Sequence, residues 1–315
     1  MHSLGRRLLP GLEKYLSDER SGYAMLVAGP QYPHTCSSFE YPARYTMSIK
    51  ENSDTSLLFV VLRGRDRVED INWRVYVNEV KVSRVFKPQH SLEIRGDLYY
   101  VYVADVSPIT KSTNTVELLV KCHARDVRIE STGLVALLPG ELQSRVGVYV
   151  GVSRIEKEYS LYVGEYGFSV VSIVGRGNGG TITSNGMSKK VNNSFEISEL
   201  LSNNRIDIAG PVNVYAMVVN AYAGKPPDIS IPSIIVEPEK VKLILTNTGD
   251  YAISNVELKL LRGTQAVQRL TMRKIGPRES SEVELNKPAP GATAIKIAYE
   301  FSGYVFTRVI QLSQP

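Results

Sequence analysis

A chain of 315 residues is long for one β-sandwich and has room for three domains of about 100 residues each. Its 43% hydrophobic and 22% charged residues are ordinary values for a globular protein and argue against intrinsic disorder. The net charge of +5 comes from 37 basic and 32 acidic residues that are mixed along the chain. Nucleic-acid-binding proteins usually gather basic residues on one face, so the composition predicts no nucleic-acid partner.

The chain shows no apolar stretch near the ~20 residues of a membrane-spanning helix, so we expect no membrane span. Near the N-terminus, Arg6–Arg7 precede Leu8–Leu9, but Pro10 ends this run before it reaches the roughly 7–15 apolar residues of a signal peptide. We therefore expect that the protein stays inside the cell, leaves by another route, or is a mature or trimmed form.

Residues 1–22 contain the best helix candidate of the chain. Leucines recur every four residues at Leu4, Leu8, Leu12 and Leu16, which gives one apolar stripe. Pro10 is suited to the first turn of a helix, so this spacing predicts a short helix over Gly11–Leu16.

Residues 23–132 are expected to form a first, jelly-roll-like β-sandwich. Strand patterns separated by turn residues cover Tyr45–Ile49, Leu57–Leu62, Trp73–Asn78, Tyr99–Val103 and Val116–Val120. The Leu57–Leu62 run is apolar throughout, which predicts a strand covered on both faces.

The two cysteines, Cys36 and Cys122, lie near the two ends of this first sandwich. They could be free buried thiols, or could form one disulfide if the protein is exported or comes from a hyperthermophile. His34 and His123 lie beside them, so a Cys2His2 zinc site is the third alternative. Adjacent residues of a strand point to opposite faces, and this weighs against Cys122 and His123 binding one ion.

Two further β-modules are expected, a second β-sandwich over residues 133–224 and an immunoglobulin-like sandwich over residues 225–315. The second has alternating or continuous apolar runs at Val146–Val150, Tyr159–Val163, Phe168–Val174 and Val212–Ala216. The third has them at Val241–Leu245, Val256–Leu260, Val283–Leu285, Ile295–Tyr299 and Val305–Ile310. Between them, Gly224–Asp228 contains two prolines and predicts an extended joint.

The third module resembles the cell-adhesion-related immunoglobulin-like domain of bacteria and archaea. The resemblance covers residues 229–312 and depends on Asn247–Asp250, a turn sequence, followed by Ser254–Leu258. The family usually has a Leu-x-Pro-Gly-x-Ser turn later on, whereas Ile275–Ser280 here places the glycine before the proline. This resemblance implies an immunoglobulin-like fold and, more distantly, an adhesive role.

The first module is similar to galactose-binding-like jelly rolls, such as the sugar-binding domain of β-galactosidases. Val75–Asn78 looks like the family's strand that ends in Val-Asn-Gly, with Glu79 in place of the glycine. Tyr102–Val106 and Asn114–Val120 look like its closing strands. In such enzymes this module is not catalytic, so the resemblance implies packing or sugar contact.

Motifs for catalysis are missing from the sequence. Gly175–Gly180 matches the letters G-x-G-x-x-G, but the residues after it read as strand and turn instead of the helix that a dinucleotide site needs, so we expect a hairpin loop there. No G-x-S-x-G and no metalloprotease spacing of histidines occurs. Asp105 and Glu117 lie near a predicted turn, where we assign them a structural role. We therefore predict no catalytic residue, no cofactor and no metal, and a protein that is not an enzyme.

Tyrosine is abundant, with 18 residues, and two groups of it occur on predicted strands. Because neighbouring residues face opposite ways, at least one of these side chains should meet solvent or a neighbouring module. An exposed tyrosine could stack on a sugar ring or anchor a protein partner, and half-buried packing within the strands is the alternative. The candidates for ligand contact are Tyr99, Tyr100, Tyr159, Tyr162 and Tyr166.

These patterns together favour a non-catalytic interaction protein of a prokaryotic, and more narrowly archaeal, cell envelope. It would act in surface assembly or adhesion through sandwich loops and edge strands, with a protein partner or a second copy of itself. A glycan-binding accessory protein that uses exposed tyrosines is the alternative, and a glycan-active enzyme is the remote one. An extracellular or envelope location is expected, with the cytoplasm left open.

Overall fold

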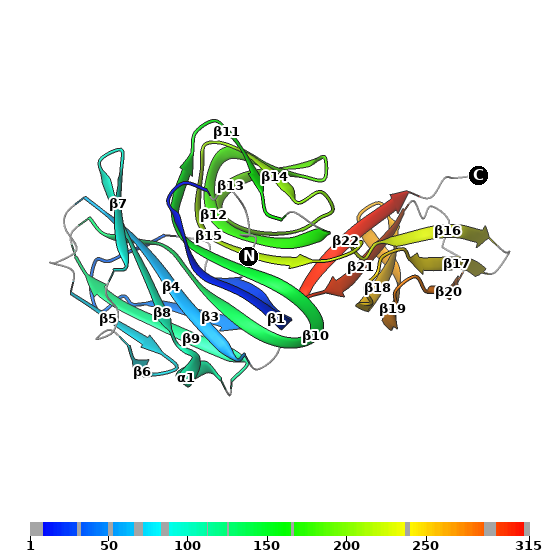
Figure 1. The fold of residues 1–315 in the computed structure, drawn as a ribbon, viewed down its shortest axis with the longest axis horizontal. Helices are drawn as coiled ribbons and strands as arrows, with labels where there is room; N and C mark the ends of the chain where they lie inside the picture. The colour runs from blue at the N-terminus through cyan, green and yellow to red at the C-terminus, as the bar shows by residue number, and fades with distance from the viewer. Residues whose placement is uncertain are drawn as a thin grey trace. The chain divides into compact units, whose positions relative to one another are not determined.

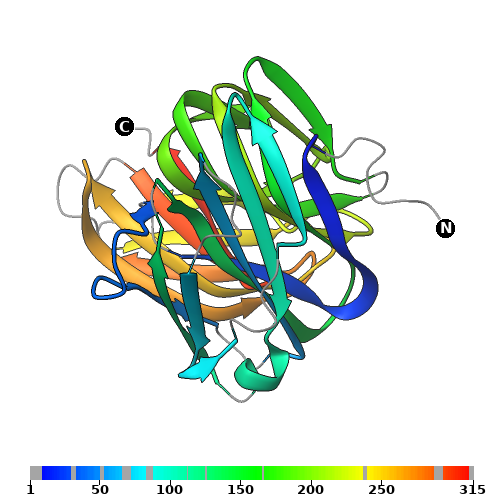
Figure 2. The same cartoon turned by 90° about the vertical axis from the view of Figure 1, so that its left-hand side faces the viewer.

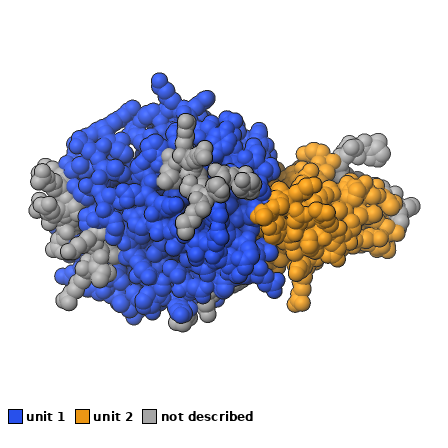
Figure 3. All heavy atoms as spheres, viewed as in Figure 1, with its two compact units in different colours: residues 1–222 blue, residues 223–315 orange. Residues whose placement is uncertain are grey.

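The computed structural model describes residues 9–29, 33–49, 53–65, 72–82, 88–111, 113–124, 126–164, 167–236, 240–286 and 294–311. In these ranges the chain forms 22 strands and one four-residue helix, α1 (Ser107–Thr110). All strand pairs are antiparallel, so the predicted all-β class with several sandwich layers is confirmed. The chain divides into two compact units, residues 1–222 and residues 223–315, which Figure 3 shows in different colours.

The predicted N-terminal helix is wrong for the described residues, because Leu12–Ala28 form strand β1. This strand pairs along its whole length with β10 (Arg128–Ile155), from Leu12 opposite Gly151 to Ala28 opposite Gly133. A helix of one or two turns is unstable by itself, whereas a long neighbouring strand supplies backbone hydrogen bonds and a buried surface. Of the four leucines, Leu12 and Leu16 lie in β1, and Leu4 and Leu8 lie outside the described residues.

Strand β10 also overturns the predicted boundary between residues 132 and 133, because the strand runs across it. Its first part pairs with β4 (Thr55–Gly64), and its last part pairs with β15 (Val212–Tyr222). The dark blue β1 follows β10 through both parts on a curved path (Figures 1 and 2). The predicted first and second modules are therefore parts of one unit that share two long strands.

The bend in these two strands is a local feature of their pairing. The register shifts between Ser21 and Gly22, whose partners on β10 are Gln143 and Pro139. Gly22 has a φ of +130°, and a Cβ atom there would lie 2.1 Å from the carbonyl oxygen of Leu138. Only glycine allows this backbone conformation and this close approach of the two strands.

The N-terminal unit consists of stacked sheets, and β4 is a strand with an apolar core on each of its two faces. Leu58, Val60 and Leu62 pack in one core, whereas Phe59 and Val61 pack in another, and all five are 0% exposed. This confirms the expectation that the strand is covered on both faces, because alternate side chains of a strand enter opposite cores.

The first of these cores is closed by a four-stranded sheet in the order β3-β9-β5-β6. Its strands are β3 (Ala43–Ser48), β9 (Thr115–His123), β5 (Asn72–Val77) and β6 (Val80–Lys81). The opposite sheet of this sandwich contains β4 together with β8 (Asp97–Asp105), β7 (His90–Ile94) and the short β2 (His34–Thr35). These strands form the sandwich that corresponds to the predicted jelly-roll-like module.

The other part of the unit is built around β15 and β12 (Phe168–Ser184). Ala216 and Val218 of β15 face the core that they share with β4, whereas Met217 and Val219 face a third core. That third core is completed by β11 (Glu158–Tyr162), β13 (Met187–Leu201) and β14 (Arg205–Ala209). Each middle strand therefore separates two apolar cores.

A buried amide ties β15 to β1 where the layers meet. The side chain of Asn220, which is 0% exposed, accepts a hydrogen bond from the Ala24 N–H at 2.7 Å and donates one to the Ala24 carbonyl at 2.8 Å. These are the two bonds that a neighbouring strand would make, so one side chain extends the pairing of β1 to a strand beyond its direct partner.

The predicted hairpin loop at Gly175–Gly180 is wrong, because β12 continues through it to Ser184. The turn follows at Asn185–Gly186, both with positive φ, which is the conformation of a tight two-residue hairpin. The segment carries two irregularities, a register shift against β15 between Val174 and Gly175 and a bulge against β13 between Asn178 and Gly180. Gly175 and Gly177 pair with strands on both sides, whereas Gly179 has a φ of +86° and is the unpaired bulge residue.

The C-terminal unit starts at Ala223 and is a seven-stranded sandwich. One sheet has the order β16 (Ile229–Val236), β17 (Lys240–Asn247), β20 (Ser280–Asn286). The other has the order β19 (Gln265–Ile275), β18 (Ile253–Arg262), β21 (Ala294–Phe301), β22 (Tyr304–Gln311). Two packed antiparallel sheets of this size form an immunoglobulin-like sandwich.

Asn247 joins the two sheets of this unit at one end. It is 0% exposed, and its Nδ2 donates to the carbonyls of Tyr251 at 2.7 Å and Gly276 at 2.9 Å. Its Oδ1 accepts from the Gly249 N–H at 3.1 Å. The turn sequence that carries the family resemblance is thus a structural element of the fold.

We expect that Asn247→Ala lowers the free energy of unfolding by roughly 1–3 kcal/mol, since buried backbone groups lose their partners. Urea denaturation followed by circular dichroism measures this change. Gln265→Ala, at an exposed position of β19, is the control and should stay within about 0.5 kcal/mol of the wild type. Equal stability of Asn247→Ala and the control would contradict this role.

Candidate functional site

A pocket of about 360 Å³ lies in the N-terminal unit, where strands from different layers come together. It is formed by the end of β1, by β3, and by parts of β10, β12 and β13. The lining residues are largely polar or charged and include one aromatic ring that is only half-buried: Ala28, Gly29, Arg44, Tyr45, Thr46, Glu130, Ser131, Val174, Gly175, Ser194, Phe195 and Glu196.

Glu130 on β10 is the most deeply buried charged side chain of the pocket wall, with an exposed fraction of 1%. Its Oε1 lies 3.4 Å from Nη1 of Arg63, and its Oε2 lies 3.2 Å from Nη1 of Arg176. The hydroxyl of Tyr215 donates to the same Oε2 at 3.4 Å. A buried carboxylate needs such partners to offset its loss of water, so the two arginines neutralise Glu130 within the wall.

Tyr215 takes part in this cluster as a buried hydroxyl. Burial, followed by the negative charge of Glu130, raises the pKa of Tyr215 far above its usual value. The phenol therefore stays protonated and acts as a hydrogen-bond donor to Glu130.

Glu196 on β13 is a different kind of carboxylate. It is exposed, yet the surrounding pocket wall removes enough water for burial to raise the pKa of its side chain. Its Oε2 accepts a hydrogen bond from the Ala28 N–H at 3.3 Å. This hydrogen bond lowers the pKa of Glu196, but by less than burial raises it. Glu196 thus offers acceptor oxygens to the pocket.

The arrangement of the two glutamates does not suit glycoside hydrolysis. That reaction needs two carboxyl groups that reach the scissile bond from opposite sides. Both oxygens of Glu130 face arginines, and its side chain is 1% exposed, so it cannot contact a ligand in the pocket. Of the other acids considered, Asp105 accepts from the Ser107 N–H at 2.9 Å as part of a turn, and Glu117 is an exposed residue of β9.

Neither a cluster of metal-binding side chains nor a membrane-spanning helix occurs in the described part of the chain. Among those residues, no three histidine, cysteine, aspartate or glutamate side chains gather where they could hold an ion. The one helix there has four residues, and none of the described helical segments could cross a bilayer.

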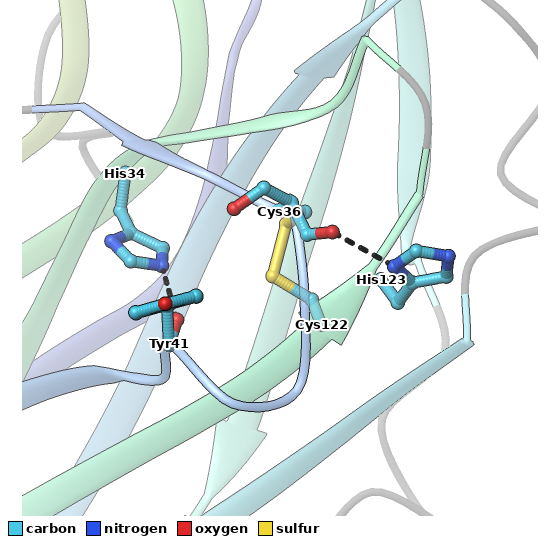
Figure 4. The surroundings of a disulfide bond; sticks show 6 residues. His34, Cys36, Tyr41, Cys122 and His123 are labelled. Atoms are coloured by element: carbon cyan, nitrogen blue, oxygen red, sulfur yellow. Dashed lines mark hydrogen bonds between the residues drawn. A yellow bond between two sulfur atoms is a disulfide. The ribbon is translucent and has the colours of Figure 1, made fainter.

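Cys36 and Cys122 form a disulfide in the structure, with 4.9 Å between their Cα atoms. Figure 4 shows the bond with His34 and His123 on either side of it. His34 Nε2 lies 3.1 Å from the Tyr41 carbonyl, and His123 Nδ1 lies 2.9 Å from the Ser37 carbonyl. Each imidazole is engaged with a backbone oxygen and the two sulfurs with each other, so this geometry is not that of a zinc site.

The tyrosines do not form the ligand surface that the sequence suggested. Tyr99 and Tyr100 are 2% and 8% exposed, because β8 is covered on both faces and its side chains enter two different cores. Tyr159 packs against the third core, whereas Tyr162 is 52% exposed with the Arg205 guanidinium 5.8 Å from its ring centroid. Tyr166 lies outside the described residues.

The pocket residues were missed by reasoning from the sequence, although a signal for two of them exists. Glu130 stands at the start of a long apolar run, and Arg176 stands within the glycine-rich segment after another. A charged residue at the end of a strand that is buried on both faces needs a partner of opposite charge. Which partner it meets depends on the stacking of layers, which the pattern does not specify.

Comparisons with known proteins identify no relative. No family model matches the chain, and no curated protein matches it. Among solved structures, a class 5 fimbrial chaperone, CfaA, is 8% identical over 92% of this chain and 100% of that chain, with a TM-score of 0.23. The FN1–FN3 domains of chicken CNTN1 are 8% identical over 94% of this chain and 100% of that chain, with a TM-score of 0.19. At these scores the overlays carry no argument about fold or function.

The raised pKa of Glu196 predicts the sign of a pH effect on stability. Between the ordinary carboxyl pKa and the higher folded-state pKa, the unfolded chain loses a proton that the folded chain keeps, so stability falls as pH rises through this window. We therefore expect Glu196→Gln, which keeps an acceptor for the Ala28 N–H, to raise the melting temperature slightly at pH 7.

The difference between Glu196→Gln and the wild type should shrink as the pH is lowered below about 4, where both states of the wild-type side chain are protonated. Thermal unfolding followed by circular dichroism at a series of pH values measures it. A melting temperature that drops at pH 7 on substitution would show that the carboxylate is stabilised, contrary to this assignment.

Proposed function

We propose that this chain is a non-catalytic interaction protein of a prokaryotic, archaeal cell envelope, which assembles by pairing edge strand β22 with β22 of a second copy. One observation carries the proposal. β22 is the last strand of its sheet, so one of its edges has no neighbouring strand among the described residues. Such an edge presents backbone N–H and C=O groups that another strand can pair with.

The side chains of β22 support this pairing. Val305 and Val309 are 61% and 53% exposed and lie on the outer face, with exposed Thr307 between them. In an antiparallel pair centred on Thr307, Val305 of one copy lies opposite Val309 of the other, and Phe306 lies opposite Arg308. A surface that is complementary to itself in this way is what a two-fold symmetric dimer requires.

Other edges of the same unit are less suited to pairing. β16 has a proline, Pro232, at a register shift against β17, and proline removes a backbone donor. β19 presents Arg269 and Arg273, both exposed, on its length, and charged side chains discourage edge contacts. β16 and β19 also expose apolar side chains, Ile234, Ile235 and Val267, but only β22 among these three edges combines exposed valines with the absence of proline and of a pair of exposed arginines.

The disulfide supports the envelope location. Disulfides persist in oxidising compartments and are rare in reducing cytosol, with hyperthermophiles as an exception. The bond closes the first sandwich by joining residues that are 86 positions apart. The immunoglobulin-like fold of the C-terminal unit is compatible with many roles, so the fold by itself does not support the proposal. The support comes from the exposed edge of β22.

Glycan binding is the second candidate function. The polar pocket of the N-terminal unit favours it, whereas the tyrosines that first suggested it are mostly buried. Hydrolysis of a glycan is not proposed, because Glu130 is held by Arg63 and Arg176 and cannot reach a substrate.

We expect that Val305→Lys with Val309→Lys weakens self-association at least tenfold, because two like charges would face each other across the pair. Sedimentation equilibrium of the purified chain over a range of concentrations measures this. Val267→Lys, at an exposed position of the opposite edge strand β19, is the matched control and should leave the dimer unchanged. Wild-type protein that stays monomeric at all concentrations would overturn the edge-pairing proposal.

The location has its own test. In fractionated native cells we expect the protein in the envelope fraction, with Cys36 and Cys122 protected from iodoacetamide until a reductant is added. Mass spectrometry of the two cysteine-containing peptides gives the readout. Recovery in the cytosol with both thiols alkylated before reduction would refute the envelope assignment.

A further inference from the structure

The pocket of the N-terminal unit has the size of a small-molecule site. Its volume of about 360 Å³ lies within the range of ligand pockets, about 300–1,000 Å³. It is assembled from strands that belong to different layers, so its walls are set by buried cores on several sides. A rigid wall of this kind holds polar groups in fixed positions without a ligand.

The charges that face the pocket nearly cancel. Inside the wall, Arg63 and Arg176 are balanced by two carboxylates, Glu130 and Asp97, the latter 2.7 Å from Nη2 of Arg63. Glu196 and Arg44 are both exposed and line the pocket, and no carboxylate of the described residues forms an ion pair with Arg44. One negative and one positive group therefore remain for a ligand. Because the two opposite charges offset each other, the pocket gives no net electrostatic attraction for a cation or an anion, which suits a molecule without net charge.

The remaining groups define what kind of neutral molecule fits. Thr46, Ser131 and Ser194 bring hydroxyl-bearing side chains to the lining, and each hydroxyl can donate or accept a hydrogen bond. Phe195 adds a half-buried aromatic ring that packs against the third core and also lines the pocket, where it can cover an apolar face. A sugar ring has this combination: hydroxyl groups around its edge that both donate and accept, and C–H groups on its face.

We propose that the pocket binds a neutral pyranose ring of a glycan. The Glu196 carboxylate accepts hydrogen bonds from ring hydroxyls, Arg44 donates to hydroxyl or ring oxygens at the mouth, and Phe195 lies against the C–H face. The raised pKa of Glu196 is consistent with this role, because hydroxyl donors replace the water that the wall removes. The site does not involve β22, so it is independent of self-association.

Saturation-transfer difference NMR on the full-length chain tests the proposal. The probes are the methyl glycosides of galactose, glucose and mannose, with glucuronate and glucosamine as the anionic and cationic comparisons. We expect signal transfer to at least one neutral glycoside, and weaker or no transfer to the two charged sugars. No transfer to any of the neutral glycosides, or stronger binding of a charged sugar, would overturn it.

Variants then locate the site. Glu196→Gln should weaken binding of the neutral glycoside at least tenfold, since charge-assisted hydrogen bonds become neutral ones, and Arg44→Ala should weaken it several-fold. Glu284→Gln, at an exposed position of β20 in the other unit, is the matched control and should bind like the wild type. Circular dichroism checks that each variant is folded, and Glu196→Gln is not expected to lose stability.

Two outcomes separate this inference from the proposed function. Val305→Lys with Val309→Lys should leave glycoside binding unchanged even where it abolishes the dimer. A folded Glu196→Gln protein that binds the glycoside as tightly as the wild type would sink the pocket assignment and leave the edge-pairing proposal untouched.

Discussion

The pairing of β1 with β10 is the constraint on which the N-terminal unit depends. Both strands pass from the layer around β4 to the layer around β15, so backbone hydrogen bonds are continuous between two sandwiches that would otherwise be separate modules. The glycine at position 22 permits the bend, and Asn220 adds two hydrogen bonds from β15 to β1. Two sandwiches linked by shared strands cannot unfold or move independently in the way that beads on a linker can.

This sharing explains the apolar sequence of the middle strands. Strands in the middle of the layers have cores on both faces, so their runs are almost wholly hydrophobic. A few charged side chains on these strands are also buried, and a buried charge is stable only when a group of opposite charge lies close to it. Glu130, Arg63 and Arg176 meet in this way from three strands. The pocket lies beside this cluster, with Glu130 in its wall.

The two sheets of the C-terminal unit end in edge strands, whose outer backbone groups have no neighbouring strand among the described residues. Its fold closes one core between two sheets, and Asn247 holds the end of the sandwich together through several hydrogen bonds. Sandwiches of this type keep edge strands, and most are protected by proline or charge. β22 instead exposes Val305 and Val309 along an edge that has no neighbouring strand among the described residues.

The sequence by itself determined the elements whose patterns are local. The period-2 alternation predicted an all-β chain, the uninterrupted run at Leu57–Leu62 predicted burial on both faces, and the proline-rich segment after residue 224 lay close to the division between the units. Tertiary structure decided what depends on neighbours far away in the chain. Residues 12–28 became a strand because β10 offers a partner, Tyr99 and Tyr100 became buried because β8 has cores on both sides, and Glu130 met Arg63 and Arg176 because three strands converge. Alternation records which side chains share a face, but it carries no information about what lies opposite that face.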